Sequence, residues 1–284
     1  MKRSDFRFLD RLRVRWAEVD MQKIVFNGHY LMYFDTAVAS YWRTLALPYH
    51  DTMEQLHGDL FVRKATVEYH GSARYDDLCA VGLRVARFGR SSMTLEAALF
   101  RDDTLLVSGE LVYVFADPVA MSSQPVPDEL RRVMQAFEDG EPMLDLRTGT
   151  WDTLGRDAKP LRQAVFVDEQ RIEGLAEDAA DTNALHVVAF NRFGRPVATG
   201  RWIDHASGAA QIGRLAVAQP LRGSGVGRQV LDALVTSARD EGKREVLLHA
   251  AYSALDFYRR AGFTPQGAVF EEAGLPHQTM VRTL

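Results

Sequence analysis

The sequence contains a single cysteine, Cys79, among its 284 residues. One cysteine cannot form a disulfide within the chain, and it cannot build a metal site from several thiolates. The sequence also has no run of about 18 apolar residues, and the basic start is not followed by an apolar stretch. We therefore expect a soluble, cytoplasmic protein with no membrane segment and no metal cofactor.

The chain also lacks an excess of positive charge. Its net charge is -4, and residues 1–140 hold 17 basic and 20 acidic residues while the remainder holds 17 and 18. A nucleic-acid-binding domain carries a clear positive excess, so we expect neither half to bind nucleic acid. Hydrophobic residues make up 46% and charged residues 25%, which is typical of globular domains. The length suits two domains of ordinary size.

Hydrophobic patterning in residues 1–138 predicts an antiparallel sheet wrapped around one long helix. Apolar residues recur every three or four positions from Tyr30 to Leu45, which is typical of a helix with one buried face. Alternating or β-rich segments predict strands at residues 8–19, 60–71, 78–89, 91–101 and 105–116. A proline-bounded helix is expected near residues 122–137.

Residues 139–150 lose this periodicity and mix glycine, proline and acids, which predicts a linker. Beyond it, residues 151–284 read as strands alternating with helices. A hairpin is expected at residues 186–203, a strand at 210–218, a helix at 225–242, a strand at 244–250 and a second helix at 253–263. The predicted fold class is therefore α+β, with one domain at 1–138 and another at 151–284.

A glycine-rich segment lies between the strand and the helix of the second half. It reads Arg222-x-x-Gly225-x-Gly227 with an additional Gly223, so it matches neither a dinucleotide fingerprint nor a Walker loop. Glycines let backbone N–H groups turn toward an anion, and the following helix presents its positive end there. The segment predicts a pyrophosphate-binding loop, with an ordinary glycine-rich turn as the alternative.

Several motifs in the second half together resemble the GNAT acetyltransferase superfamily across about residues 151–284. They are "AVFVDEQRI", "IGRLAV", "RGSGVG", "DFYRRAGF" and "EEAGLPHQTM". The resemblance implies a mixed sheet and a coenzyme A substrate, as acetyl-CoA or acyl-CoA, lying along a splayed strand. It implies contacts from Leu215, Ala216 and Val217, and pyrophosphate binding by the amides of Arg222, Gly223, Ser224, Gly225, Val226 and Gly227.

The same resemblance implies that Tyr258 protonates or hydrogen-bonds the departing thiolate, and that the acyl group passes to an amine. A phenol is a weak acid beside a thiol, but it is a good donor to developing negative charge on sulfur. The base that takes the proton of the amine is left open. The candidates are Glu169, Glu177, His249 and His277.

Residues 17–35 place an acid shortly before the expected long helix. The sequence Glu18-Val19-Asp20, followed by Ile24 to Tyr30, resembles the 4-hydroxybenzoyl-CoA thioesterase-like branch of the hotdog fold, across residues 8 to about 138. The resemblance implies that Asp20 acts on the thioester carbonyl, as nucleophile or as general base for water. The backbone N–H of Asn27 would polarise the carbonyl oxygen.

Two positions in this half have more than one interpretation. Lys23 stands where members of the hotdog family often have glycine, which bears on how the loop admits substrate. Arg90 is a candidate contact for coenzyme A phosphates, with an exposed structural arginine as the alternative. Hotdog domains pair their sheets edge to edge, so the resemblance also implies a homodimer or homotetramer.

Both predicted sites take an acyl thioester of coenzyme A, and they differ in the nucleophile that receives the acyl group. We expect a bifunctional enzyme that hydrolyses acyl-CoA in its first half and acylates an amine in its second. In one alternative only the transferase is catalytic, and the hotdog half assembles the protein or senses acyl-CoA. In another, the protein is a non-catalytic regulator that binds coenzyme A.

Overall fold

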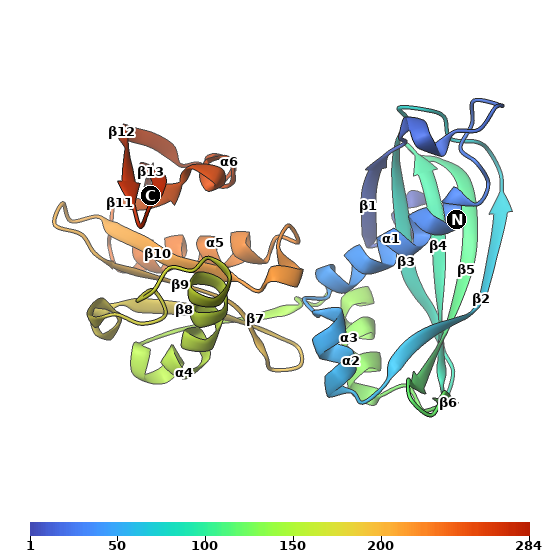
Figure 1. The fold of residues 1–284 in the computed structure, drawn as a ribbon, viewed down its shortest axis with the longest axis horizontal. Helices are drawn as coiled ribbons and strands as arrows, with labels where there is room; N and C mark the ends of the chain where they lie inside the picture. Colours follow the sequence, from blue (N-terminus) through green and yellow to red (C-terminus); the bar gives the residue numbers. More distant parts are fainter. The chain divides into compact units, whose positions relative to one another are not determined.

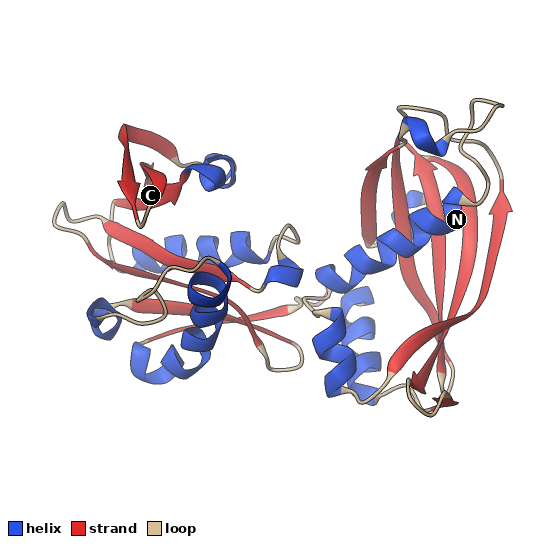
Figure 2. Cartoon of the chain, in the orientation of Figure 1, coloured by secondary structure: helices blue, strands red, loops and turns tan.

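The computed structural model describes all 284 residues and divides into two compact units, Met1–Met143 and Leu144–Leu284 (Figure 1). Each unit has its own sheet and its own helices (Figure 2). None of the helices combines the length and the apolar character needed to cross a bilayer.

The amino-terminal unit is a curved antiparallel sheet around a central helix. Its elements are β1 (Phe8–Arg13), α1 (His29–Thr44), α2 (Tyr49–Gln55), β2 (Asp59–Tyr69), β3 (Leu78–Phe88), β4 (Ser92–Arg101), β5 (Thr104–Asp117), β6 (Ser122–Ser123) and α3 (Asp128–Glu138). The strand order is β1-β3-β4-β5-β2, with β6 on β5, and every pairing is antiparallel. The predicted hotdog arrangement is confirmed.

Helix α1 packs against the sheet through the apolar face that the sequence pattern predicted. Its buried residues are Tyr30, Tyr33, Phe34, Ala37, Val38, Tyr41 and Trp42. They recur at spacings of three and four, so they form one stripe along the helix, and this stripe packs against the sheet. Burial of so many large side chains fixes the helix, and with it the position of its first turn.

The first strand is shorter than predicted. It ends at Arg13, and residues Trp16–Glu18 form a 3₁₀ turn instead of continuing the strand to residue 19. The side chain of Glu18 accepts a hydrogen bond from the backbone N–H of Arg15 at 2.7 Å, which closes the turn. Helix α2 was not predicted either, since it is only two turns long.

The carboxy-terminal unit is a seven-stranded mixed sheet with helices on both faces. Its strands are β7 (Leu144–Gly149), β8 (Leu185–Asn191), β9 (Pro196–Asp204), β10 (Ala210–Val217), β11 (Glu245–Ala251), β12 (Thr264–Glu272) and β13 (Leu275–Thr283). Its helices are α4 (Trp151–Arg162), the π-helix η3 (Gln163–Glu169), α5 (Val226–Asp240) and α6 (Leu255–Arg260). The strand order is β12-β13-β11-β10-β9-β8-β7.

Only β10 and β11 pair in parallel, and α4 and α5 cover opposite faces of the sheet (Figure 1). We call these the α4 face and the α5 face. The predicted mixed sheet is confirmed. So are the hairpin of β8 and β9, the strands β10 and β11, and the helices α5 and α6.

Part of the predicted linker is a strand. Residues Leu144–Gly149 form β7 and pair antiparallel with β8, from Leu144 opposite Asn191 to Gly149 opposite His186. This edge strand is mostly exposed, so it lacks the apolar alternation by which a strand is recognised in sequence. The hairpin of β12 and β13 was missed for the same reason, because its residues are largely exposed.

Candidate functional site

Asp20 lies in a tight turn that precedes helix α1. Its backbone N–H donates to the carbonyl of Ile24 at 2.9 Å, and the N–H of Lys23 donates to the carbonyl of Asp20 at 2.9 Å. Its Oδ1 accepts from the N–H of Gln22 at 2.8 Å. Lys23 has a φ of 62°, a left-handed conformation that glycine adopts at least cost. Lys23 therefore preserves the turn at a cost of about 1 kcal/mol.

Glu18 ties this turn to the helix. It is only 3% exposed, and its Oε2 accepts a hydrogen bond from the Tyr33 hydroxyl of α1 at 2.7 Å. Burial on its own would raise the pKa of Glu18, but hydrogen bonds from the Arg15 N–H and from Tyr33 outweigh it and lower the pKa. Glu18 is thus a buried anion that positions the loop, and Asp20 is the half-buried acid of this segment.

The start of α1 presents free backbone donors near this turn. The N–H groups of Asn27 and Gly28 donate no hydrogen bond within the chain, and the helix begins at His29. The Asn27 carbonyl accepts from the Tyr69 hydroxyl at 3.2 Å, which orients the peptide. In this arrangement the carboxylate can attack a carbonyl carbon. The unpaired N–H donors at the positive helix end can stabilise the oxyanion that the attack creates.

The surroundings of this turn are apolar and open to solvent within one chain. Met21, Trp16 and Phe26 are 101%, 75% and 50% exposed, and Tyr69 and Tyr75 are each 54% exposed. Trp16 packs its ring edge-on against Tyr75. Large aromatic and thioether side chains are seldom left so exposed together unless they form a contact surface.

The structure does not bring Arg90 to Asp20 within one chain. The Asp20 turn lies beside the start of β3, because Ile24 bridges to Arg74 and Val14 bonds to Asp77. Arg90 follows the other end of that strand, 11 residues away, or about 35 Å. Within a single chain, therefore, Asp20 and Arg90 cannot contact the same substrate, with Asp20 at its thioester and Arg90 at its phosphates.

In the carboxy-terminal unit, β10 separates from β11 partway along its length. Their parallel pairing stops at Ile212 opposite Leu248, and the register with β9 shifts between Gly213 and Ala216. Arg214, at this bulge, has a φ of 54°. Beyond the bulge, residues 215–217 have no partner strand on the β11 side, so their backbone groups border an opening in the sheet.

The glycine-rich loop lies beside this opening and turns its N–H groups outward. Gly223 and Gly225 have φ values of 80° and 89°, which only glycine adopts without strain. The N–H groups of residues 223, 225, 226 and 227 have no acceptor in the chain. Those of Arg222 and Ser224 instead bond to the carbonyls of Gln219 and Leu221 within the turn. Four of the six predicted amides are therefore free.

A pocket of about 610 Å³ joins the loop, the opening and α6. Of the predicted contact residues, it is lined by Leu215, Val217, Arg222, Gly223, Gly225, Gly227 and Tyr258. The side chains of Ala216 and Val226 are buried, and the Ser224 hydroxyl donates to the carbonyl of Leu221. These three residues can therefore contact a ligand only through backbone groups. The size and the mixture of apolar walls with a few polar groups suit a large ligand that carries phosphates.

Tyr258 reaches this pocket with its hydroxyl free of any partner in the chain. Its ring packs edge-on against Phe257 and Phe263, with centroids 4.9 and 5.9 Å away. Burial raises the pKa of Tyr258 to about 12. The phenol therefore stays protonated at neutral pH and can donate a hydrogen bond to a developing thiolate.

The guanidinium of Arg222 is paired with Glu169 of η3. Both terminal nitrogens donate to the carboxylate at 2.6 Å, and Nε donates to the carbonyl of Val217 at 3.2 Å. The hydrogen bond from Arg222 lowers the pKa of Glu169. A carboxylate held in this way is a weak base, so the geometry argues against Glu169 as the proton acceptor.

Replacing Glu169 with glutamine is expected to tighten the binding of coenzyme A about three- to tenfold. The substitution removes a negative charge beside the loop and frees Arg222 to pair with phosphate instead. Isothermal titration calorimetry measures the change, and Asp168→Asn, on the same π-helix, is the matched control. Equal or weaker binding by the Glu169 variant would contradict this assignment.

The remaining base candidates differ in their availability. Glu177 accepts from Trp151 Nε1 at 3.0 Å and pairs with Lys159, whose hydrogen bond lowers its pKa. His249 Nδ1 bonds to Glu272 Oε2 at 2.8 Å, and His277 Nδ1 bonds to the Leu275 carbonyl at 2.9 Å. Each histidine keeps its second ring nitrogen free, whereas Glu177 is committed to its ion pair.

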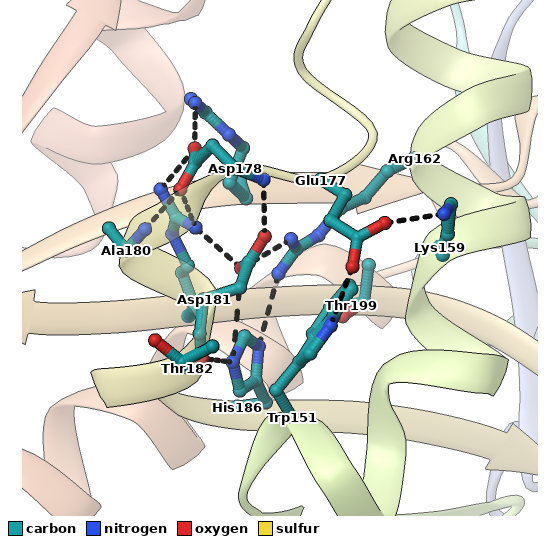
Figure 3. Close-up of polar contacts among 12 residues, drawn as sticks. Trp151, Lys159, Arg162, Glu177, Asp178, Ala180, Asp181, Thr182, His186 and Thr199 are labelled. Atoms are coloured by element: carbon teal, nitrogen blue, oxygen red, sulfur yellow. Dashed lines mark hydrogen bonds and ion pairs between the residues drawn. The ribbon is translucent and has the colours of Figure 1, made fainter.

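A buried ionic cluster that was not predicted from the sequence lies on the α4 face (Figure 3). Asp181 accepts from Arg162 and Arg201 at 2.7 and 2.5 Å, and Asp178 accepts from Arg201 and Arg214. Arg162 is fully buried and Asp181 is 1% exposed. The only signals in the sequence were an arginine and a histidine inside otherwise apolar strands, Arg201 and His186.

Comparisons with known proteins identify similarities for both units. Residues 155–284 match the model of the acetyltransferase (GNAT) domain, and residues 22–108 match that of the thioesterase superfamily. The chain is 32% identical, over 129 residues, to the uncharacterized N-acetyltransferase YjcF of Bacillus subtilis. This match covers 45% of the chain and 91% of the relative.

Solved structures are similar to each half. An acyl-CoA N-acyltransferase from Pseudomonas aeruginosa is 29% identical with a TM-score of 0.45, covering 49% of this chain and 99% of that one. A thioesterase superfamily protein from Jannaschia sp. CCS1 is 21% identical with a TM-score of 0.43, covering 45% and 90%.

Proposed function

Because the chain belongs to the GNAT acetyltransferase family through its carboxy-terminal unit, and carries a thioesterase-superfamily hotdog domain before it, we propose a bifunctional acyl-CoA enzyme. The carboxy-terminal unit transfers an acetyl or acyl group from coenzyme A to an amine, and the amino-terminal unit hydrolyses acyl-CoA. The observation that carries the proposal is the pocket that combines four free loop amides with the unpartnered hydroxyl of Tyr258.

Coenzyme A enters this scheme as a substrate. Its pyrophosphate accepts hydrogen bonds from the free N–H groups at residues 223 and 225–227, at the positive end of α5. The pantetheine arm follows Leu215 and Val217, whose backbone groups can bond to its amides where β11 has separated. The thioester then lies near Tyr258.

In the transfer step, the amine nitrogen attacks the thioester carbonyl carbon. The C–N bond forms, the C–S bond breaks, and the sulfur leaves as a thiolate that Tyr258 stabilises by its hydrogen bond. The proton lost by the nitrogen passes to a base. Of the four candidates we assign this role to His249, because Glu272 orients its ring, its second nitrogen is free, and it lies on the strand that borders the opening.

In the hydrolysis step, Asp20 either attacks the thioester carbonyl or deprotonates a water that attacks it. The oxyanion is held by the N–H groups of Asn27 and Gly28 at the start of α1. The exposed aromatic side chains around the turn fit an interface, so we propose that a second copy covers this site in a homodimer or homotetramer. Arg90 of one chain would then serve coenzyme A bound at the Asp20 site of another.

Release of free thiol from a panel of acyl-CoAs, with and without added amines, tests the proposal. The bifunctional enzyme releases thiol without amine and faster with it. Release only with amine supports a second function, in which the hotdog unit assembles the protein or senses acyl-CoA. The exposure in one chain of Trp16, Met21 and Phe26 around the Asp20 turn favours this second function. No release under either condition rejects catalysis.

Replacing Tyr258 with phenylalanine is expected to lower kcat for acyl transfer about 100-fold. The variant keeps the packed ring but removes the only side-chain donor that we place at the thiolate. Steady-state thiol release with saturating amine measures it, and Tyr252→Phe, an exposed tyrosine six residues earlier, is the control. Full transfer activity in the Tyr258 variant would remove this residue from the mechanism.

A further inference from the structure

The buried ionic cluster on the α4 face carries more positive than negative charge. It holds the guanidinium groups of Arg162, Arg201 and Arg214 against the carboxylates of Asp178 and Asp181. Burial lowers the pKa of His186, so its imidazole is neutral at pH 7 and adds no charge. One positive charge is therefore uncompensated in a poorly hydrated region, where an anion interacts strongly.

Arg214 is the member of the cluster that keeps unused donors. Its Nη2 donates to Asp178 Oδ2 at 2.6 Å, its Nε is buried without an acceptor, and its Nη1 makes no hydrogen bond in the chain. Its side chain is 23% exposed, whereas those of Arg162 and Arg201 are 0% and 7% exposed. Asp178 is also engaged by both terminal nitrogens of Arg201. Arg214 is thus the guanidinium that an incoming anion can reach.

The position of Arg214 relates it directly to the transfer site. It occupies the bulge at which β10 leaves β11, and the next residue, Leu215, lines the proposed coenzyme pocket. Its ion pair with Asp178 places its guanidinium on the α4 face with the rest of the cluster. A group bound there lies beside the opening through which a nucleophile reaches the thioester.

The assigned base shares this face of the sheet. Arg201 pairs with Gly213 in β10, and Gln211, two residues earlier on the same face, pairs with Leu247 in β11. His249, two residues after Leu247, therefore points to the α4 face, since side chains alternate along a strand. Two adjacent strands thus present a cation and a base on the same side of the sheet.

We propose that Arg214 binds a carboxylate of the acyl acceptor, and that the acceptor is a free amino acid whose α-amine is acylated. This inference rests on the proposed transferase function and deepens it. An amino acid places its carboxylate and its amine on the same carbon, which matches a cation on β10 beside a base on β11. The unused Nη1 of Arg214 would bond to the carboxylate, with its charge balancing the excess charge of the cluster.

The reaction then follows the transfer step without any additional reagent. The α-ammonium group first loses one proton to His249, which passes it to solvent; the neutral amine then attacks the thioester carbon, and its second proton ends on the leaving sulfur. The new C–N bond replaces the C–S bond, and the thiolate leaves toward Tyr258. The products are an N-acyl amino acid and coenzyme A.

The test uses the full-length protein, acetyl-CoA and matched pairs of amines that differ only by the carboxylate. The pairs are phenylalanine with phenethylamine, tyrosine with tyramine, histidine with histamine, leucine with isoamylamine and lysine with cadaverine. At least one amino acid should be acetylated with a kcat/KM about 10- to 100-fold above that of its partner, because a charge-assisted hydrogen bond is lost with the carboxylate. Product is identified by mass spectrometry.

In Arg214→Gln the preference for the carboxylated partner should fall to near unity, mainly through a higher KM for the amino acid. Arg239→Gln, an exposed arginine on α5, is the matched control. Arg214→Lys keeps the charge but loses the planar guanidinium that bonds to Asp178 and to a ligand together, so it should retain part of the preference even if the glutamine variant is unstable. Thermal unfolding of both variants identifies any loss of fold.

The possible failures are distinguishable. If the amines without a carboxylate are acetylated as well as the amino acids, Arg214 does not select a carboxylate and this inference is wrong, while the transferase function stands. The same holds if the preference survives in Arg214→Gln. If nothing in the panel is acetylated although calorimetry detects coenzyme A binding, both the inference and the transferase assignment are rejected.

Discussion

Replacement of Asp181 with asparagine is expected to lower the free energy of unfolding of the carboxy-terminal unit by about 3–5 kcal/mol. Asp181 is 1% exposed and accepts hydrogen bonds from Arg162, Arg201 and the backbone N–H of Asp178. The variant leaves the fully buried guanidinium of Arg162 facing Arg201 without the charge between them. Urea unfolding, with hydrogen exchange of peptides from β8 and β9 to localise the effect, measures it.

The dependence of stability on pH provides a second readout for the same residue. Burial acts to raise the pKa of Asp181, but its hydrogen bonds and charge interactions with arginine prevail and lower it. A carboxyl with a lowered pKa in the folded state stabilises the protein above its unfolded pKa, about 3.9, and that contribution is lost as the pH falls. Stability should therefore decrease less steeply below about pH 4 in Asp181→Asn than in the natural protein.

The control is Asp240→Asn, at the exposed end of α5, which should change the free energy of unfolding by less than about 0.5 kcal/mol. A loss below about 1 kcal/mol in Asp181→Asn would mean that the cluster does not hold this unit together. It would also count against an anion-binding role for Arg214.

Replacement of Asp20 with asparagine is expected to reduce the amine-independent hydrolysis of acyl-CoA about 1,000-fold, equivalent to about 4 kcal/mol of transition-state stabilisation. The amide keeps the size of the carboxylate and can still accept from the N–H of Gln22, so the turn is preserved. It can neither attack the carbonyl nor take a proton from water. Thiol release without amine is the measurement.

Two comparisons make this result specific. Asp35→Asn, an exposed acid on the same helix that Asp20 precedes, should hydrolyse acyl-CoA normally. Transfer to an amine should be unchanged in Asp20→Asn, because Tyr258 and the glycine loop belong to the other unit. Hydrolysis that persists in the Asp20 variant would assign the thiol release to another group and favour an assembling or sensing role for the hotdog unit.

Local patterns were sufficient to predict most of the elements of both units. The apolar stripe of α1, the helix after the glycine loop and the positions of Asp20 and Tyr258 depend on residues close together in the chain. Lys23 shows the limit of such reasoning. Members of the hotdog family often have glycine at this position. Lys23 nevertheless adopts the left-handed backbone conformation that glycine adopts most easily.

What the sequence alone determined was therefore most of the helices and strands, the division into two halves and the family that each half resembles, because periodicity and motifs are encoded over a few residues. Only the tertiary structure decided that Glu169 and Glu177 are neutralised by cations, that Arg90 lies far from Asp20, and that β7 belongs to a sheet. It also decided that Arg214 has donors to spare. These ion pairs, distances and strand pairings depend on contacts between residues far apart in the chain, and burial sets the strength of the ion pairs. No local sequence pattern could therefore have indicated them.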